Sequence, residues 1–168
     1  MKNVWTKTIL TVYRYLDRIA GAIDKLVDRQ AMNSYYSAYT NSGVIDIADE
    51  IIKLSERKVK LINLKALTLE ALKNIDMQFA QLLIEKYIDG DGCEEIAKRH
   101  NLCTRTYFRR LEQAEDNFIN YFSMQGFGEK KLYEYLKGEA WIMEVQRKFK
   151  AKKMIEMQEE QDEIRECV

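Results

Sequence analysis

The sequence predicts an all-α protein, and three observations lead to this prediction. The chain has 168 residues with no proline and only 7 glycines. Its apolar residues recur at alternating spacings of four and three over two long stretches, which is the period of one face of a helix. With 46% hydrophobic residues, it is too apolar for a disordered chain, and a β-sandwich or barrel would need more turn residues. We expect a helical region at 1–75, a compact helical domain at 76–122 and a helical extension at 123–168.

A first long helix is expected over residues 3–33. One apolar stripe with alternating spacings of four and three runs along it, formed by Trp5, Ile9, Val12, Leu16, Ile19, Ile23 and Leu26. Such a stripe packs against the next helix or against a second copy of the chain. Tyrosines and small polar residues break the pattern at 33–43, and we expect a loop there.

A second long helix is expected over residues 44–75, which contain no glycine. The same alternating spacing recurs in it, at Ala48, Ile52, Ser55, Val59, Ile62, Ala66 and Leu69. Further apolar residues widen the apolar surface of this helix, namely Ile51, Leu54, Leu61, Leu64, Leu67 and Leu72, so it contacts more than one neighbour. The two long helices therefore form a helical hairpin or a coiled-coil-like pair. Antiparallel pairing is the economical arrangement, and self-association of the second helix is the alternative.

Shorter elements follow. A short helix with Phe79, Leu83 and Tyr87 on one side ends at 88–92, where two glycines and two aspartates form a turn that supplies the cap of the next helix. A second break at 123–128 precedes two further short amphipathic helices. The chain closes on a basic block and an acidic run, which we interpret as a solvated, fraying helix, with a binding tail as the alternative.

Charge and composition exclude several functional classes. The 27 basic and 27 acidic residues cancel, so nucleic-acid binding would require a local basic patch. Charged residues interrupt the apolar start of the chain, and no apolar stretch is long enough to span a bilayer. We therefore expect neither export nor a membrane partner.

Cysteine and histidine usage bears on location and chemistry. The cysteines Cys93, Cys103 and Cys167 are odd in number and form no CxxC pair, which favours reduced thiols in a cytoplasmic protein. The single histidine, His100, lies between two of them, but the paired spacing of a zinc site is missing. No nucleophile with a base and no phosphate-binding glycine loop occurs. We expect no metal, no cofactor and no enzymatic activity.

Residues 93–111 have the spacing of a helix-turn-helix. This motif needs a small residue where its first helix passes closest to the second, and apolar residues on both sides. Ala97 is the small residue, Leu102 lies in the turn, and Tyr107 and Leu111 face inward from the second helix. The domain at 76–122 is therefore a helix-turn-helix domain.

The outward edge of the second helix is basic. Thr104, Arg105, Phe108, Arg109 and Glu112 lie on it, and from Thr104 to Leu111 there are three arginines and no acidic residue. In a DNA-binding motif of this type the edge enters the major groove, where arginine can bind guanine through two hydrogen bonds. This short edge is the local patch that the neutral chain otherwise lacks.

The same residues resemble a known family. The run Lys86-Tyr87-Ile88-Asp89-Gly90, then Glu94-Glu95-Ile96-Ala97, then Leu102-x-x-Arg105-Thr106-Tyr107-x-Arg109-Arg110-Leu111 is similar to region four of bacterial sigma factors. It resembles more specifically the small phage-type transcriptional regulators of the RinA and ArpU kind. The resemblance covers about residues 44–120, and it implies a supporting helix at 93–99 and a recognition helix at 104–118.

The resemblance also implies the roles of individual residues. Thr104, Arg105, Phe108 and Arg109 would face DNA, and Arg110 would contact the phosphate backbone. Four features differ from the usual pattern, and the first is that Asp91-Gly92 stands where an apolar residue normally opens the supporting helix. Asn101 replaces the glycine that opens the turn and tolerates a left-handed backbone. His100 replaces an apolar residue and is expected to be packed or to lie at the rim of the core, and Cys103 replaces a serine cap.

Two hypotheses of function follow. In the first, the chain is a transcriptional regulator that binds double-stranded DNA and uses its front helices to form a homodimer or to contact RNA polymerase. In the second, it is a helical interaction or scaffold protein, and its helix-turn-helix serves only packing or protein binding.

Overall fold

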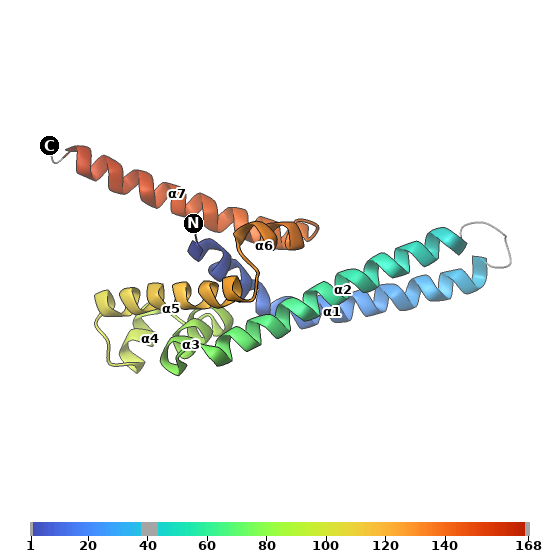
Figure 1. Ribbon diagram of the computed structural model, residues 1–168, viewed down its shortest axis with the longest axis horizontal. Helices are drawn as coiled ribbons and strands as arrows, with labels where there is room; N and C mark the ends of the chain where they lie inside the picture. Colours follow the sequence, from blue (N-terminus) through green and yellow to red (C-terminus); the bar gives the residue numbers. More distant parts are fainter. Residues whose placement is uncertain (1, 38–43, 167–168) are drawn as a thin grey trace. The chain divides into compact units, whose positions relative to one another are not determined.

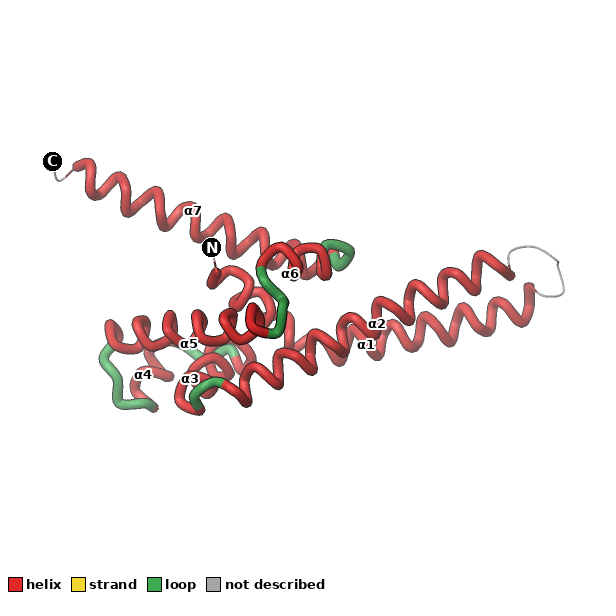
Figure 2. Tube along the Cα trace, viewed as in Figure 1, coloured by secondary structure: helices red, strands yellow, loops and turns green. Residues whose placement is uncertain are grey.

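The computed structural model describes residues 2–37 and 44–166. Every regular element in this part of the chain is a helix (Figures 1 and 2), so the all-α prediction is confirmed. In chain order the elements are α1 (Lys2–Ser37), α2 (Val44–Asn74), α3 (Met77–Leu83), the π-helix η1 (Ile84–Asp89), α4 (Cys93–Arg99), α5 (Thr104–Met124), α6 (Glu129–Leu136) and α7 (Ala140–Glu166).

The chain divides into two compact units. Tyr13–Leu69 form the first, which we call the helix-pair unit. The described residues through Val12, together with those from Glu70 on, form the second, which we call the multihelical unit. The boundary falls inside α1 and again inside α2.

Within the helix-pair unit, α1 and α2 lie side by side and run antiparallel (Figure 1). Lys58 bonds to Asp24 at 2.5 Å, and Lys65, two turns further along α2, bonds to Asp17, two turns earlier in α1, at 2.6 Å. These pairs are largely exposed, and such pairs contribute at most about 1 kcal/mol each. They fix the register more than they stabilise the unit.

The structure corrects the predicted packing face of α2. The seven residues from Ala48 to Leu69 that were expected to pack are all exposed. α2 instead buries Leu61 and Leu64 and half-buries Ile47, Ile51 and Leu54. The helix carries two apolar stripes, and periodicity alone does not determine which of them meets α1. The stripe of α1 is buried at Ile9, Val12, Leu16 and Ile23 but not at Leu26, which is 45% exposed.

The end of α1 also differs from the prediction. The expected loop at 33–43 is wrong for its first part, because α1 continues through Ser37. Residues 33–37 contain neither proline nor glycine, so nothing in the backbone forces the helix to stop at Asn33. The remainder of the expected loop, 38–43, lies outside the described residues.

The core of the multihelical unit surrounds α5. Both α3 and α4 contact α5, and Phe118 and Phe122 of α5 are fully buried, with ring centroids 4.9 Å apart. The first turns of α1 are buried on more than one side, at Val4, Trp5, Thr6, Thr8, Ile9 and Leu10. This part of α1 is a core element and not only one stripe of an amphipathic helix.

The turn after η1 forms as predicted in one respect and differs in another. Gly90 ends the helix with φ of 86°, and its N–H donates to the Glu85 carbonyl at 3.1 Å. A left-handed residue after a helix is most easily a glycine. The expected cap of the next helix is absent, since Gly92 is the N-cap of α4 and no side chain caps it.

The predicted break at 123–128 separates α5 from α6, although its first two residues still belong to α5. α5 ends at Met124 and α6 begins at Glu129. Leu132 and Leu136 of α6 and Ile142 of α7 are fully buried. The second helix was expected to be short, but α7 is 27 residues long and continues through the basic block.

Candidate nucleic-acid interface

Two helices and a short turn build the candidate site. α4 has the predicted bounds, Cys93–Arg99, and α5 begins at the predicted Thr104 but extends six residues beyond Phe118, to Met124. In the turn the Leu102 N–H donates to the Ala97 carbonyl at 2.8 Å. Asn101 is left-handed with φ of 54°, the conformation expected of it in place of glycine. The turn therefore forms with an asparagine, in place of glycine, at its left-handed position.

The inner faces of these helices match the sequence interpretation. Ile96 and Ala97 of α4 and Tyr107 and Leu111 of α5 are buried, and α4 contacts α5. Leu102 in the turn is half-buried. Because these residues hold α4 and α5 together, the remaining side of α5 is oriented outward.

The outward edge of α5 is exposed and basic. Thr104, Arg105, Phe108, Arg109 and Glu112 are exposed, whereas Arg110 is half-buried. Neither Arg105 nor Arg109 forms an ion pair with a carboxylate in the described part of the chain. Arg105 and Arg109 lie four residues apart, so their guanidinium groups emerge one turn from each other. Both are free to bind an anion.

Phe108 lies on the outward edge of α5 and also lines a cavity. Its ring meets Tyr107 edge-on with centroids 5.2 Å apart, and the side chain is 51% exposed. It also lines an open cavity of about 840 Å³ beside α7. Four lysines of this cavity come from α1, η1 and α7, namely Lys7, Lys86, Lys152 and Lys153, against two carboxylates, Glu112 and Glu115. The sequence interpretation did not place the α7 lysines next to this edge of α5.

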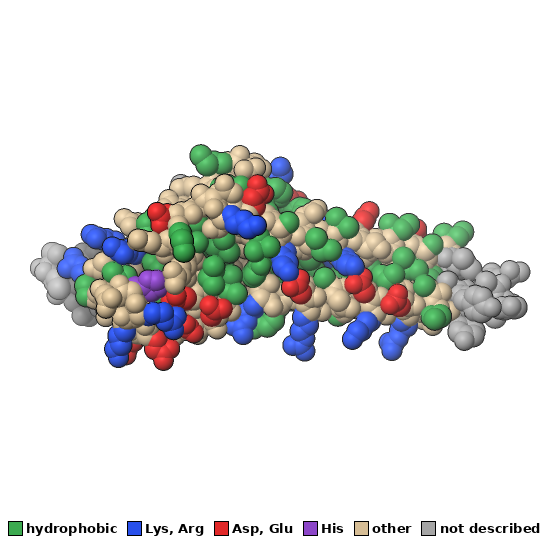
Figure 3. Space-filling model, turned by 90° about the horizontal axis from the view of Figure 1, so that it is seen from below, with side chains coloured by type: hydrophobic (Ala, Val, Ile, Leu, Met, Phe, Trp, Pro, Cys, Tyr) green, Lys and Arg blue, Asp and Glu red, His purple; other side chains and the backbone are tan. Residues whose placement is uncertain are grey.

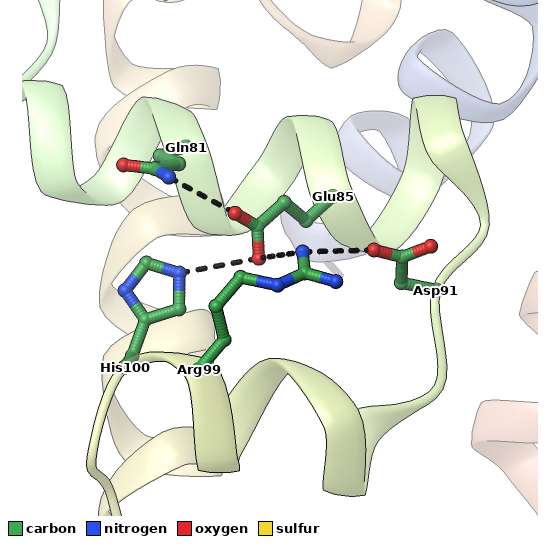
Figure 4. Close-up of polar contacts among 5 residues, drawn as sticks. All are labelled: Gln81, Glu85, Asp91, Arg99 and His100. Carbon is green, nitrogen blue, oxygen red and sulfur yellow. Dashed lines mark hydrogen bonds and ion pairs between the residues drawn. The ribbon is translucent and has the colours of Figure 1, made fainter.

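A buried carboxylate ties η1 to α4 (Figure 4). Glu85, 6% exposed, accepts hydrogen bonds from Gln81 Nε2 at 3.0 Å and from His100 Nε2 at 3.1 Å. Arg99 Nη1 lies 3.1 Å from the same carboxylate and 2.9 Å from Asp91 Oδ2. Buried carboxylates are tolerated when such partners satisfy them. This cluster fixes the end of α4, from which the turn to α5 begins.

His100 is a packed side chain, as predicted, because its side chain is only 20% exposed and contacts Glu85. Cys103 is the N-cap of α5, but no side-chain cap forms. Its thiol instead lies 3.1 Å from Thr106 Oγ1, a contact that lowers the pKa of Cys103. The described residues contain no group of three potential ligands for a metal ion.

A second polar contact anchors the inner side of α5. The Tyr87 hydroxyl donates to Glu115 Oε1 at 2.5 Å, and Lys7 Nζ lies 3.8 Å from Glu115 Oε2. The Thr6 hydroxyl donates to the backbone carbonyl of Glu115 at 3.0 Å. Burial raises the pKa of Glu115, although Tyr87 and Lys7 oppose the shift. Burial also raises the pKa of Tyr87.

Sequence reasoning did not identify Glu85, Tyr87 and Glu115 as polar anchors. A signal for Glu115 exists in the pattern, because it lies four residues after Leu111 and three before Phe118, on the inward face of α5. A carboxylate on an apolar face requires a partner. Its partners come from α1 and η1, far away in sequence, and could not be identified from α5 alone.

No helix in the described ranges is both long and apolar enough to cross a membrane. No protein-family model, curated protein or solved structure matches this chain.

Proposed function

We propose that this protein is a non-enzymatic, cytoplasmic transcriptional regulator that binds double-stranded DNA by placing the outward edge of α5 in the major groove. One observation carries the proposal. Arg105 and Arg109 are exposed, unpaired with any described carboxylate and one helical turn apart, on a helix whose opposite face is buried.

The roles of the residues follow from their positions. Arg105 and Arg109 bind base edges, guanine above all, and Thr104 at the start of α5 contacts a phosphate or a thymine methyl. Phe108 makes apolar contact with bases, and the half-buried Arg110 contacts a phosphate. The resemblance to region four of sigma factors supports the same roles and adds RNA polymerase as a partner.

The lysines beside α5 extend this surface. Lys86, Lys152 and Lys153 line the cavity that Phe108 also lines, so positive charge continues from the edge of α5 towards α7. Phosphate contacts of this kind provide affinity but little sequence preference. α7 would then hold the DNA backbone while α5 reads the bases.

A DNA-binding titration of the full-length chain tests the proposal. Fluorescence anisotropy with labelled duplexes, including the DNA upstream of its own coding region, should give an affinity that falls steeply as salt rises. The double variant Arg105→Ala/Arg109→Ala should lose at least about tenfold in affinity, since each arginine-to-guanine contact is worth roughly 1–3 kcal/mol.

A matched control separates specific contacts from net charge. Lys25 and Arg29 of α1 are exposed and also four residues apart, so Lys25→Ala/Arg29→Ala removes the same charge elsewhere. We expect this variant to bind DNA like the unmodified chain. Equal loss in both variants, or no binding to any duplex at low salt, would refute the proposal.

A helical interaction protein is the second candidate function, because the apolar stripe of α2 is exposed. It differs from the first candidate in one measurable respect. A protein complex isolated by pull-down that survives Arg105→Ala/Arg109→Ala, without any DNA affinity, would favour it.

A further inference from the structure

One face of α2 carries an unpartnered apolar stripe, which we call the α2 stripe. Its aliphatic members range from 39% to 79% exposed, at Ile45, Ile52, Val59, Ile62 and Leu69, and its small members Ala48, Ser55 and Ala66 are exposed as well. Figure 3 shows hydrophobic side chains at the surface along the helix-pair unit, towards the right of the view. Contiguous apolar surface of this kind is typical of an interaction site.

α1 does not cover the α2 stripe. The contacts of α2 with α1 lie on another side of the helix, where Lys58 and Lys65 bond to Asp24 and Asp17 and where Leu61 and Leu64 are buried. The stripe is therefore additional to the face that holds the helix-pair unit together.

The repeat of the stripe is that of a coiled coil. With Ile52 at heptad position a, the a positions are Ile45, Ile52, Val59 and Ala66, and the d positions are Ala48, Ser55, Ile62 and Leu69. The stripe spans more than three heptads and about 36 Å of helix, the length at which a coiled coil is indicated. Three of the four a positions are β-branched, which in parallel coiled coils favours two strands over three or four.

We propose that the α2 stripe binds the α2 stripe of a second copy of this chain, as a parallel two-stranded coiled coil. A heptad stripe packs against another stripe of the same repeat. In a dimer with two-fold symmetry, the same surface of each copy forms the interface. This inference does not depend on DNA binding, and each can fail without the other.

The charges beside the stripe select the parallel orientation. Parallel pairing places Glu56, at position e, opposite the apolar Ile51, at position g, of the second copy, and it does so twice. Antiparallel pairing that keeps the whole stripe in contact, with Ile45 opposite Leu69, places Glu56 next to Glu56 of the second copy. Like charges facing each other destabilise such pairs.

Sedimentation equilibrium of the full-length chain tests the association. The unmodified protein should sediment at twice the chain mass of 19.9 kDa. Ile52→Glu/Ile62→Glu should return it to the mass of one chain at the same concentration, with helical circular dichroism unchanged because both side chains are exposed. The control Leu26→Glu/Met32→Glu makes the same change at exposed residues of α1 and should leave the dimer intact.

A crosslink tests the orientation. In a chain with Cys93, Cys103 and Cys167 replaced by serine, Ser55→Cys places a thiol at a d position that faces its own copy only in a parallel pair. We expect a disulfide-linked dimer from Ser55→Cys and none from Lys53→Cys, which is exposed but off the stripe.

Three results would overturn the inference. One is a single-chain mass for the unmodified protein at tens of micromolar, and another is a dimer that persists in Ile52→Glu/Ile62→Glu. The third is a dimer in which Ser55→Cys does not crosslink, which refutes the parallel arrangement.

Discussion

Tyr87 and Glu115 are joined by a hydrogen bond of 2.5 Å that links η1 to α5. The acceptor is buried, and its other oxygen faces Lys7 at 3.8 Å. The contact therefore joins the start of α1, η1 and α5 inside the multihelical unit. The bond lies on the inward face of α5, while the opposite edge of the helix is exposed.

The buried carboxylate makes stability depend on pH. Burial raises the pKa of Glu115 above its ordinary value of 4.5, so the folded state holds the proton more tightly than the unfolded chain does. The stability from this group is fully present below the unfolded pKa and is lost as pH rises through the folded pKa. Glu115→Gln, which keeps an acceptor for Tyr87 and has no charge, should become more stable relative to the unmodified chain as pH rises from about 4 to 7.

Urea unfolding at a series of pH values measures this difference. Glu112→Gln, a change at an exposed residue of the same helix, should give a much flatter difference over the same range. Equal pH dependence in the two variants would contradict the assignment to Glu115.

Tyr107 provides the opposite case, a buried hydroxyl that makes no hydrogen bond of normal geometry with any described residue and has only the Cys93 thiol beside it. Burial, with the nearby Cys93 thiol, raises the pKa of Tyr107. Removing an unsatisfied polar group restores desolvation free energy, so Tyr107→Phe should increase the free energy of unfolding by about 1 kcal/mol. Tyr87→Phe removes a bond that is made and should cost about 1–3 kcal/mol. Calorimetric unfolding should show shifts of opposite sign, and a loss of stability in both would show that the Tyr107 hydroxyl has a partner.

Glu85 should be a larger determinant of stability than the half-buried Asp91. Glu85→Ala removes the acceptor shared by Gln81, His100 and Arg99 and should cost about 2–4 kcal/mol. Asp91→Ala breaks only the pair with the half-exposed Arg99 and should cost less than about 1 kcal/mol. Both are measured by urea unfolding. Similar losses would mean that the buried cluster does not anchor α4.

Arg110 and Arg105 should affect DNA binding differently if the proposed function holds. Arg110→Ala should weaken binding to all sequences alike and reduce the salt slope by about 1, as expected of a phosphate contact. Arg105→Ala should relax the preference at one base pair by roughly 1–3 kcal/mol. Competition titrations with single-base variants of a bound duplex distinguish the two. The same uniform loss in both variants would exclude base recognition by Arg105.

The sequence predicted the helical class and the residues of α4 and α5 that are buried, because each depends on local periodicity. The resemblance to region four of sigma factors placed Asn101 where a glycine usually opens the turn, and a left-handed backbone was expected there for that reason. The sequence did not predict that α2 presents its heptad stripe outward, because two apolar stripes on one helix are equivalent until a neighbour is placed. The partners of Glu85 and Glu115 come from other helices, so their contacts exist only in the folded chain.

The extent of η1 was also beyond the sequence interpretation. A π-helix is defined by backbone bonds from residue i to i+5, and side-chain periodicity over six residues cannot distinguish it from the end of an α-helix. The basic cavity next to Phe108 was missed for a similar reason. The lysines that line it from α7 were interpreted as part of a solvated tail.

The wide turn of η1 makes this segment sensitive to its length. Glu85 contacts His100, and Tyr87, only two residues later, contacts Glu115. Both bonds therefore form only if the backbone of η1 keeps these two side chains at their present angles around the helix axis. Each residue of a helix advances the chain by a set angle, about 100° in an α-helix and less in a π-helix. Deleting one residue between Ile84 and Asp89 would therefore rotate every later side chain by such an angle. Substitutions can be accommodated here, but deletion of one residue from η1 would change the orientation of both α4 and α5.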